Sequence, residues 1–446
     1  MSKVLFDSLQ KYKNLKRSSF HTPGHKGKAI KNADFFSLDY TELPFTDSLY
    51  ESRGIIKQAE DNLSELYGSK RSIFSCGGNT LCMQAMIRLC APNGGKILCD
   101  RVVHRAAISA FALLGLDAVW LERQIDQTTG ITKRISEEDI EKHLKDDSDI
   151  KAVYITSPDY YGILQDIKSI SEVCKKYNVP LIVDNAHGSH LKFLGMGLHP
   201  LEQGATMSAD SAHKTLPVLT GGAWLHINDE KFCDDAKNAM ALFGSTSPSY
   251  SVMASMDMCA DWLKTRGEAE YQNLAEFVSD VRKLARSSGL YVPDESVSDP
   301  CRITLGAWKI GLTGEEFRDF LYKFKIEPEF CDENYVVLIP SPFNTQIDRI
   351  RLKMAVKKAK QIAKKECKIK SFLPKLPQKS MSIRTAVMSV KKCVDVQDAY
   401  GKVAAEIACP CPPGVPIVMP GEVIGKDEID ALTNYGVFKI NVVESN

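Results

Sequence analysis

The sequence lacks an excess of charge of either sign. Its 446 residues include 57 Lys and Arg against 56 Asp and Glu, which gives a formal net charge of +1. It also lacks an apolar run long enough to cross a membrane, and its N-terminal segment lacks the apolar core of a signal peptide. Nothing in this composition indicates a nucleic acid or a membrane as a partner.

Internal repeats and low-complexity segments are absent too, and so is the pattern of a disulfide framework. The 13 cysteines are odd in number and most lie in apolar segments, which is typical of a reduced cytoplasmic protein. Cys409 and Cys411 are too close together for a usual zinc pair. His187, His190 and His199 have no carboxylate or thiol at a helpful spacing. We therefore expect no metal site.

Segment 208–217 places Lys214 among small polar residues, directly after a histidine. Earlier in the chain, the apolar run 181–183 ends in Asp184. A lysine on a small-residue turn and a carboxylate at a strand end are what pyridoxal 5'-phosphate (PLP) requires. The lysine amine holds the aldehyde as a Schiff base, and the carboxylate keeps the pyridine nitrogen protonated, so that the ring acts as an electron sink. The two segments together predict a PLP site.

Short apolar runs alternate with helical patterns between residues 55 and 227. The predicted strands are 72–76, 96–100, 118–121, 152–156, 181–183 and 223–227. The predicted helices are 55–67, one that follows the turn 77–80 and ends near residue 90, 104–114 and 167–177. This alternation indicates an α/β domain with a mostly parallel sheet and helices on both faces. Ligands of such sheets bind beyond the carboxyl ends of the strands, where Gly78, Asp184 and Lys214 fall.

The remainder of the chain predicts smaller units. Helices are expected at 252–264, 268–287, 314–324 and 349–363, with strands at 301–305 and 335–339. The Pro- and Lys-rich segment 371–380 is typical of a linker. We therefore predict four parts: an N-terminal arm with an active-site loop (1–52), a PLP-binding major domain (53–288), a small α+β domain (289–370) and a C-terminal module (371–446).

Two hydroxyl-rich segments are candidate phosphate sites. Residues 77–80, Gly-Gly-Asn-Thr, lie between a strand and a helix. Backbone amides, the Thr80 hydroxyl and the helix dipole favour an anion there, although a simple turn and helix cap is the alternative. Residues 245–250 offer further hydroxyl groups, or they cap a helix. Either segment becomes more informative once Lys214 is accepted as a PLP lysine.

Several polar side chains near this lysine have two interpretations each. His104 either caps a helix or covers one face of the PLP ring. Asp184, at the end of a buried strand, requires a cationic partner, which is a protonated pyridine nitrogen or an arginine. His187 and His213 flank these residues and are hydrogen-bond partners or proton carriers.

Five motifs occur in an order that resembles the ornithine/lysine/arginine decarboxylases. They are Phe-His-Thr-Pro-Gly-His-Lys (20–26), Thr-Glu-Leu to Asp (41–47), Ser-Ala-His-Lys (211–214), Ser-Thr-Ser-Pro (245–248), and Pro-Pro-Gly-Val-Pro with Pro-Gly-Glu (412–416, 420–422). The chain is similar to the shorter members, which lack the N-terminal wing domain. The resemblance implies PLP fold type I, which is aspartate aminotransferase-like. It also implies α-decarboxylation of arginine, lysine or ornithine, which feeds polyamine metabolism.

The resemblance also implies roles for individual residues. Lys214 forms the Schiff base, Asp184 holds the ring nitrogen and His104 stacks on the ring. The residues expected to hold the phosphate are Gly78, Asn79, Thr80, Ser211 and His213, with Ser245 or Thr246 of a partner subunit in a homodimer or larger homo-oligomer.

The substrate side has two candidates. Glu329, in segment 326–329, matches the glutamate that contacts the distal cation of the substrate, and a surface acid is the alternative. His25 lies on the loop 20–27, which either lines the site for an anion or carboxylate or is an exposed turn.

Three positions depart from the family pattern. Asn185 replaces a glutamate, Cys411 replaces a tyrosine, and Asn79 replaces a small hydroxyl residue. These departures leave the core chemistry intact and the choice among the three basic amino acids open.

Other proteins of the same fold are the alternatives. An aminotransferase needs an arginine that clamps the α-carboxylate, for which Arg349 or Arg351 is available. Another PLP lyase and a catalytically idle PLP-fold binding protein complete the set. The presence of both Lys214 and Asp184 disfavours the idle protein.

Overall fold

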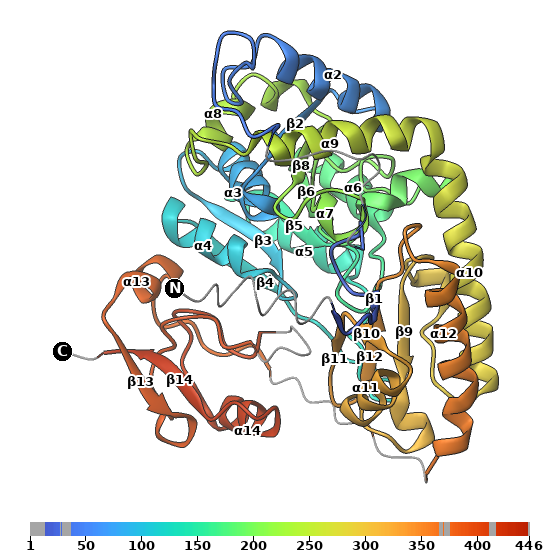
Figure 1. The fold of residues 1–446 in the computed structure, drawn as a ribbon. Coiled ribbons are helices and arrows are strands. Elements are labelled where there is room, and N and C mark those ends of the chain that lie inside the picture. Colours follow the sequence, from blue (N-terminus) through green and yellow to red (C-terminus); the bar gives the residue numbers. More distant parts are fainter. Residues whose placement is uncertain are drawn as a thin grey trace, which may run out of the picture.

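A seven-stranded sheet forms the centre of the larger part of the molecule (Figure 1). The computed structural model describes residues 14–26, 28, 37–364, 369, 375–409 and 416–444. In spatial order the strands are β2 (Arg71–Ser75), β8 (Ala223–Ile227), β7 (Met207–Asp210), β6 (Leu181–Asp184), β5 (Ile150–Thr156), β3 (Lys96–Asp100) and β4 (Asp117–Leu121). The strands from β7 to β4 pair in parallel, whereas β8 is antiparallel to both of its neighbours. The predicted mostly parallel α/β sheet is confirmed.

Helices cover both faces of this sheet. On β5, Val153 and Ile155 face one way and Ala152 and Tyr154 the other, as the pleat requires. The first pair packs with α5 (Glu137–Asp146) and α6 (Ile167–Lys176), and the second with α3 (Gly78–Cys90), α4 (Arg105–Leu114) and α8 (Ala236–Ala241). The sheet is therefore buried on both sides, which accounts for its continuous apolar runs.

Two elements of this domain were absent from the sequence prediction, and one began a residue too early. Strand β7 is short and half polar, and α5 buries only Ile140 and Leu144, so neither has a strong apolar pattern. The helix predicted from residue 104 begins at Arg105, because His104 is its N-cap. Helix α2 (Ile55–Tyr67) has the predicted bounds and ends at Gly68, whose φ of 71° is left-handed.

Long helices connect this domain to a smaller lobe. Helix α9 (Tyr250–Trp262) leads into α10 (Glu268–Ser287), whose buried face packs against the lobe. The lobe contains a three-stranded antiparallel sheet in the order β11-β12-β9 and two helices. These elements are β9 (Ile303–Gly306), β11 (Phe330–Cys331), β12 (Tyr335–Leu338), α11 (Gly314–Lys323) and α12 (Gln346–Lys358).

A two-stranded pairing brings the N-terminal motif to this lobe. Strand β1 (Ser18–Phe20) lies parallel to β10 (Ile326–Pro328), with Phe20 opposite Pro328. The loop that follows β1 and the residue that follows β10, Glu329, are therefore neighbours although they are far apart in the sequence. Nothing in the sequence analysis indicated this pairing.

The C-terminal part contains an antiparallel hairpin pair and two helices, which lie beside α4 in Figure 1. Its elements are α13 (Ile383–Met388), β13 (Lys391–Asp395), α14 (Lys426–Asn434) and β14 (Lys439–Val443). Cys411 and residues 412–415 of the last motif lie outside the described residues. Among the described helices, none combines the length and the apolar character needed to cross a membrane.

Candidate active site

Lys214 lies on α7 (Ala212–Thr215), a single helical turn directly after β7. Its Nζ is 3.1 Å from Nε2 of His187, which follows β6. Burial lowers the pKa of Lys214; the charges of Asp184 and Glu329 oppose this shift, and that of Arg302 adds to it. A lowered pKa favours the neutral amine, which is the form that attacks an aldehyde.

Asp184 ends β6 and is only 2% exposed. Its carboxylate accepts hydrogen bonds from Asn79 Nδ2 (2.8 Å), the Tyr154 hydroxyl (3.1 Å) and the Ala186 amide (3.2 Å). All three donors are neutral, and no described cationic side chain forms an ion pair with this carboxylate. A buried carboxylate without a counter-charge is unfavourable. A protonated ring nitrogen would supply that charge, so Asp184 fits PLP.

The turn that opens α3 adjoins the lysine turn. Gly78 has a φ of 65° and its amide donates to Gly221 O (2.9 Å), while the His213 amide donates to Gly222 O (3.1 Å). The two candidate phosphate segments therefore share one loop, and the exposed Thr80 lies in the first turn of α3. This arrangement suits an anion at a helix start.

Two of the expected phosphate residues have other partners within the chain. Asn79 directs its side-chain amide to Asp184 rather than outward. His213 Nδ1 lies 3.1 Å from Gly222 O and 3.4 Å from the Ser211 hydroxyl. Because a carbonyl only accepts, the proton of neutral His213 is on Nδ1, and Nε2 donates to an anion only when the ring is protonated. Burial lowers the pKa of His213, so the neutral ring is favoured.

The His25 loop packs directly on the lysine turn. The Gly24 amide donates to His213 O (2.9 Å), and a Cβ at Gly24 would lie 2.5 Å from Leu216 O, so only glycine fits there. Burial lowers the pKa of His25, and the charges of Lys26 and His213 lower it further. His25 is thus within electrostatic range of the phosphate candidates.

Glu329 lies on the opposite wall, directly after β10. Its Oε2 accepts from the Thr22 amide (2.7 Å) and its Oε1 from the Tyr160 hydroxyl (3.2 Å). The Tyr160 ring packs edge-on against His187 at 5.0 Å between centroids. Each carboxylate oxygen therefore has one neutral donor and lone pairs to spare, which suits a cationic ligand.

Four residues of this site were missed by the sequence analysis: Tyr154, Tyr160, Lys26 and Arg302. Arg302, 1% exposed, donates to His187 O (3.3 Å), and its Nη1 is 3.5 Å from His187 Nδ1. Burial lowers the pKa of Lys26 to about 7, and its Nζ donates to Ile339 O (2.9 Å). Lys26 was quoted within its motif, but nothing in the sequence showed that it is buried.

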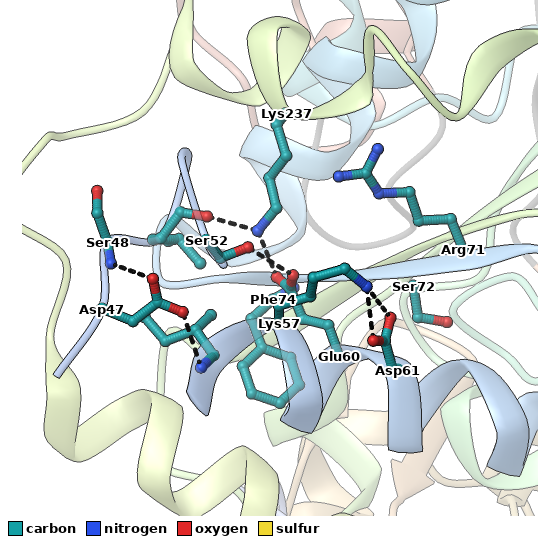
Figure 2. A network of polar contacts seen from close by, with 12 residues as sticks. Asp47, Ser48, Ser52, Lys57, Glu60, Asp61, Arg71, Ser72, Phe74 and Lys237 are labelled. Carbon is teal, nitrogen blue, oxygen red and sulfur yellow. Dashed lines mark hydrogen bonds and ion pairs between the residues drawn. The ribbon is translucent and has the colours of Figure 1, made fainter. Parts of the chain in front are cut away.

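Ser245 and Thr246 are exposed at the end of α8. Figure 2 shows the polar network that holds the neighbouring loop 41–52. Asp47 accepts from the amides of Ser48 (3.0 Å) and of Gly54 and Ile56 (2.8 and 3.1 Å) at the start of α2, and the Tyr250 hydroxyl donates to Asp47 O (2.6 Å). The motifs 41–47 and 245–248 thus belong to one anchored surface.

Lys237 fixes the same loop from α8. Its Nζ donates to Glu60 Oε1 (2.6 Å) and to Leu49 O (2.5 Å), and Glu60 also accepts from the Phe74 amide (3.0 Å) (Figure 2). Both charged side chains are buried, so the ion pair is a strong constraint on where the loop lies.

The three histidines considered for zinc do not converge. His190 pairs with Asp299 (2.9 Å) and His199 with Asp210 (2.9 Å), whereas His187 contacts Lys214. This zinc hypothesis is therefore wrong. The departure at Asn185 lies in the second pair: Asn185 Nδ2 is 2.9 Å from both oxygens of Asp210.

The arginines considered for an aminotransferase lie on α12. Arg351 Nη1 donates to the Ser18 hydroxyl (2.9 Å), and the Arg349 guanidinium lies over the Phe277 ring at 5.0 Å. Neither contact involves a residue of the Lys214 site. The buried arginine next to that site is Arg302.

Comparisons with known proteins agree with this architecture. The family model described as "Orn/Lys/Arg decarboxylase, major domain" matches residues 4–292, and "Orn/Lys/Arg decarboxylase, C-terminal domain" matches residues 366–438. An arginine decarboxylase of Bacillus subtilis is 28% identical over 95% of this chain and 92% of its own length. One of Bacillus anthracis is 28% identical over 96% and 91%.

Solved structures show the same fold. The constitutive lysine decarboxylase of E. coli superimposes with a TM-score of 0.76 at 18% identity, over 99% of this chain and 82% of its own. A lysine decarboxylase of Francisella novicida gives a TM-score of 0.75 at 18% identity, over 89% and 73%. The expected PLP fold type I is therefore confirmed.

Proposed function

Because the chain belongs to the Orn/Lys/Arg decarboxylase family, we propose that it is a PLP-dependent enzyme that removes the α-carboxyl group of a basic L-amino acid. The observation that carries the proposal is the pairing of a buried lysine amine, Lys214, with a buried carboxylate, Asp184, that has only neutral donors. Arginine is the first substrate we propose. The full-length relatives named arginine decarboxylase share nearly the whole length of this chain.

The geometry of Glu329 supports arginine as well. A carboxylate with lone pairs on both oxygens matches the planar donor fork of a guanidinium, which forms two parallel hydrogen bonds. The Thr22 amide and the Tyr160 hydroxyl orient Glu329 through its two oxygens. An ammonium group, as in lysine or ornithine, gains one such contact less from the same carboxylate.

Each residue of the site has a defined task in this reaction. When bound, PLP supplies the electron sink that accepts the electron pair of the broken carbon–carbon bond. Asp184 keeps a proton on the ring nitrogen, and His104 covers one face of the ring. Lys214 Nζ binds the cofactor carbonyl; once substrate has displaced it, this amine and His187 Nε2 are the groups placed to return a proton to Cα.

The phosphate contacts and the subunit arrangement are part of the proposal. Gly78, Thr80, Ser211 and His213 would hold the phosphate from one subunit, with Asn79 serving Asp184 instead. The exposed Ser245 and Thr246 would reach the phosphate of a second subunit, which makes the enzyme at least a homodimer.

The division of the chain follows the same reasoning. We propose an N-terminal arm and loop (1–52), a PLP-binding major domain (53–288), a small α+β domain (289–370) and a C-terminal module (371–446). A role in polyamine synthesis in the cytoplasm is consistent with the product of such a reaction and with the free thiols of the described cysteines.

Product analysis tests the proposal. Purified protein with added PLP is given arginine, lysine or ornithine, and carbon dioxide, amine and keto acid are measured. We expect one carbon dioxide and one amine per amino acid consumed, with arginine the best substrate. Lys214→Ala should abolish turnover and the visible absorbance of the bound cofactor, whereas the exposed Lys231→Ala should retain both. Stoichiometric keto acid would identify an aminotransferase instead.

A further inference from the structure

The C-terminal part of the chain holds the far end of α4, the helix that begins at His104. Nη1 of Arg384, on α13, donates to Ala112 O (3.0 Å) and Leu113 O (2.9 Å). The last carbonyls of a helix have no partner within the helix, and a positive charge there complements the helix dipole. Figure 1 shows α13 against the end of α4.

A buried ion pair holds the segment that precedes the helix. The guanidinium of Arg101 donates through Nη1 to Oε1 of Glu422 (2.7 Å) and through Nη2 to Oε2 (2.8 Å), and both side chains are 4% exposed. Nη2 also donates to Ile417 O (3.0 Å), and Glu422 Oε2 accepts from the Met419 amide (2.8 Å). The geometry is bidentate and dry, which makes it strongly directional.

The short segment between Arg101 and His104 is itself fixed. The Val102 amide donates to Asp100 Oδ1 (3.0 Å), and Val103 is buried in the same apolar cluster as Met419 and Ile383 of the C-terminal part. His104 Nδ1 then accepts from the Ala106 amide (3.1 Å), which sets the direction of its ring. A shift of Arg101 therefore has little slack to absorb it before reaching His104.

We infer that Arg101, Glu422 and Arg384, here called the C-terminal clamp, are positioning residues for the decarboxylation site. The clamp sets where the His104 ring stands relative to Asp184 and Lys214, so the C-terminal part contributes to cofactor binding without touching the cofactor. The inference rests on the proposed function, because it takes His104 as the residue that covers the ring.

The test combines Glu422→Gln with a readout on α4 that needs no cofactor. Replacing the carboxylate by an amide removes the charge and one acceptor that face Arg101. We expect amides of residues 105–114 to exchange hydrogen faster in the apo-protein. We also expect a changed visible circular dichroism of bound PLP and a PLP dissociation constant higher by on the order of tenfold. Glu406→Gln is the matched control, because Glu406 pairs with exposed Lys391 in the same C-terminal part (3.6 Å).

The double variant with His104→Ala separates positioning from general destabilisation. If the clamp acts through His104, Glu422→Gln changes neither the dichroism nor the PLP dissociation constant further in the His104→Ala background, although exchange in α4 still rises. Equal effects of Glu422→Gln in both backgrounds would overturn the inference, and so would unchanged exchange in α4. Arg384→Gln, at the exposed end of the clamp, provides the same readouts if Glu422→Gln does not fold.

The outcomes also distinguish this inference from the proposed function. A wild-type protein that binds no PLP contradicts the function, while hydrogen exchange in α4 still reports on the clamp. A wild-type protein that binds PLP and releases carbon dioxide, but shows additive effects in the double variant, contradicts the clamp alone.

Discussion

The amine of Lys214 lies 3.1 Å from Nε2 of His187, and His187 is held on its other side by Arg302. A guanidinium has only donors, so Nδ1 of His187, 3.5 Å from Arg302 Nη1, faces it as an acceptor. The proton of neutral His187 is then on Nε2, directed at Lys214, whose nitrogen must accept it as a neutral amine. Burial lowers the pKa of both groups, in agreement with this arrangement.

Arg302→Met should move the pH dependence of cofactor capture to higher pH. The positive charge of Arg302 lowers the pKa of Lys214, so its removal raises that pKa and leaves less neutral amine at a given pH. The rate at which apo-protein gains visible absorbance with PLP, measured against pH, checks this. Arg302→Lys keeps the charge and should keep the profile. A profile of Arg302→Met that coincides with wild type contradicts the electrostatic role.

Asn79→Ala should lower kcat with little change in KM. The Asn79 amide supplies one of three hydrogen bonds to the Asp184 carboxylate. Loss of a hydrogen bond to a charged group is worth about 1.5–3 kcal/mol, which corresponds to a roughly 10- to 100-fold change. Steady-state kinetics give the value, and Asn79→Ser, which restores the hydroxyl of the family pattern, should recover part of it. A rise in KM alone would place Asn79 on the substrate instead.

Glu329→Gln should raise KM for arginine by roughly 10- to 100-fold, from the loss of a charge-assisted contact, with a smaller effect on kcat. The matched control is Glu327→Gln, because Glu327 pairs with Arg17 on the outside of β10. Kinetics with arginine, lysine and ornithine check the prediction. If all three substrates keep their wild-type KM in Glu329→Gln, the distal cation is bound elsewhere.

The sequence predicted the parts of the site that share one sheet. Asp184, His187 and Lys214 follow neighbouring parallel strands, so the alternation of strands and helices was enough to bring them together. It also placed the 77–80 turn at the same edge. Local patterning sufficed here because each residue directly follows a strand of the same sheet.

The substrate wall was beyond that reasoning, because it depends on pairing between distant segments. Glu329 meets Thr22 only because β1 lies along β10. Arg302 reaches His187 from the smaller lobe, and its neighbours in the sequence carry no motif. Asn79 looked like a phosphate residue from its position, but its longer side chain reaches Asp184. Such contacts follow from tertiary packing, not from spacing along the chain.

The Glu60–Lys237 ion pair should be essential for the loop 41–52. Both side chains are buried, at 4% and 6% exposure, so Lys237→Met leaves a buried carboxylate without its partner and should lower the free energy of unfolding by about 3–5 kcal/mol. The Glu60→Leu/Lys237→Met double variant removes both charges and should recover much of this stability. Denaturant unfolding measures both values.

The same pair of variants tests how the loop affects the assembly. Lys237 also donates to Leu49 O, and Tyr250 holds Asp47 O, so the loop is tied to the surface that carries Ser245 and Thr246. The double variant restores stability but not the bond to Leu49 O. It should therefore remain folded while the proposed homodimer dissociates at a higher protein concentration than in wild type. Sedimentation across a dilution series measures this, and a wild-type dissociation constant in the double variant would show that Lys237 serves the fold of one subunit alone.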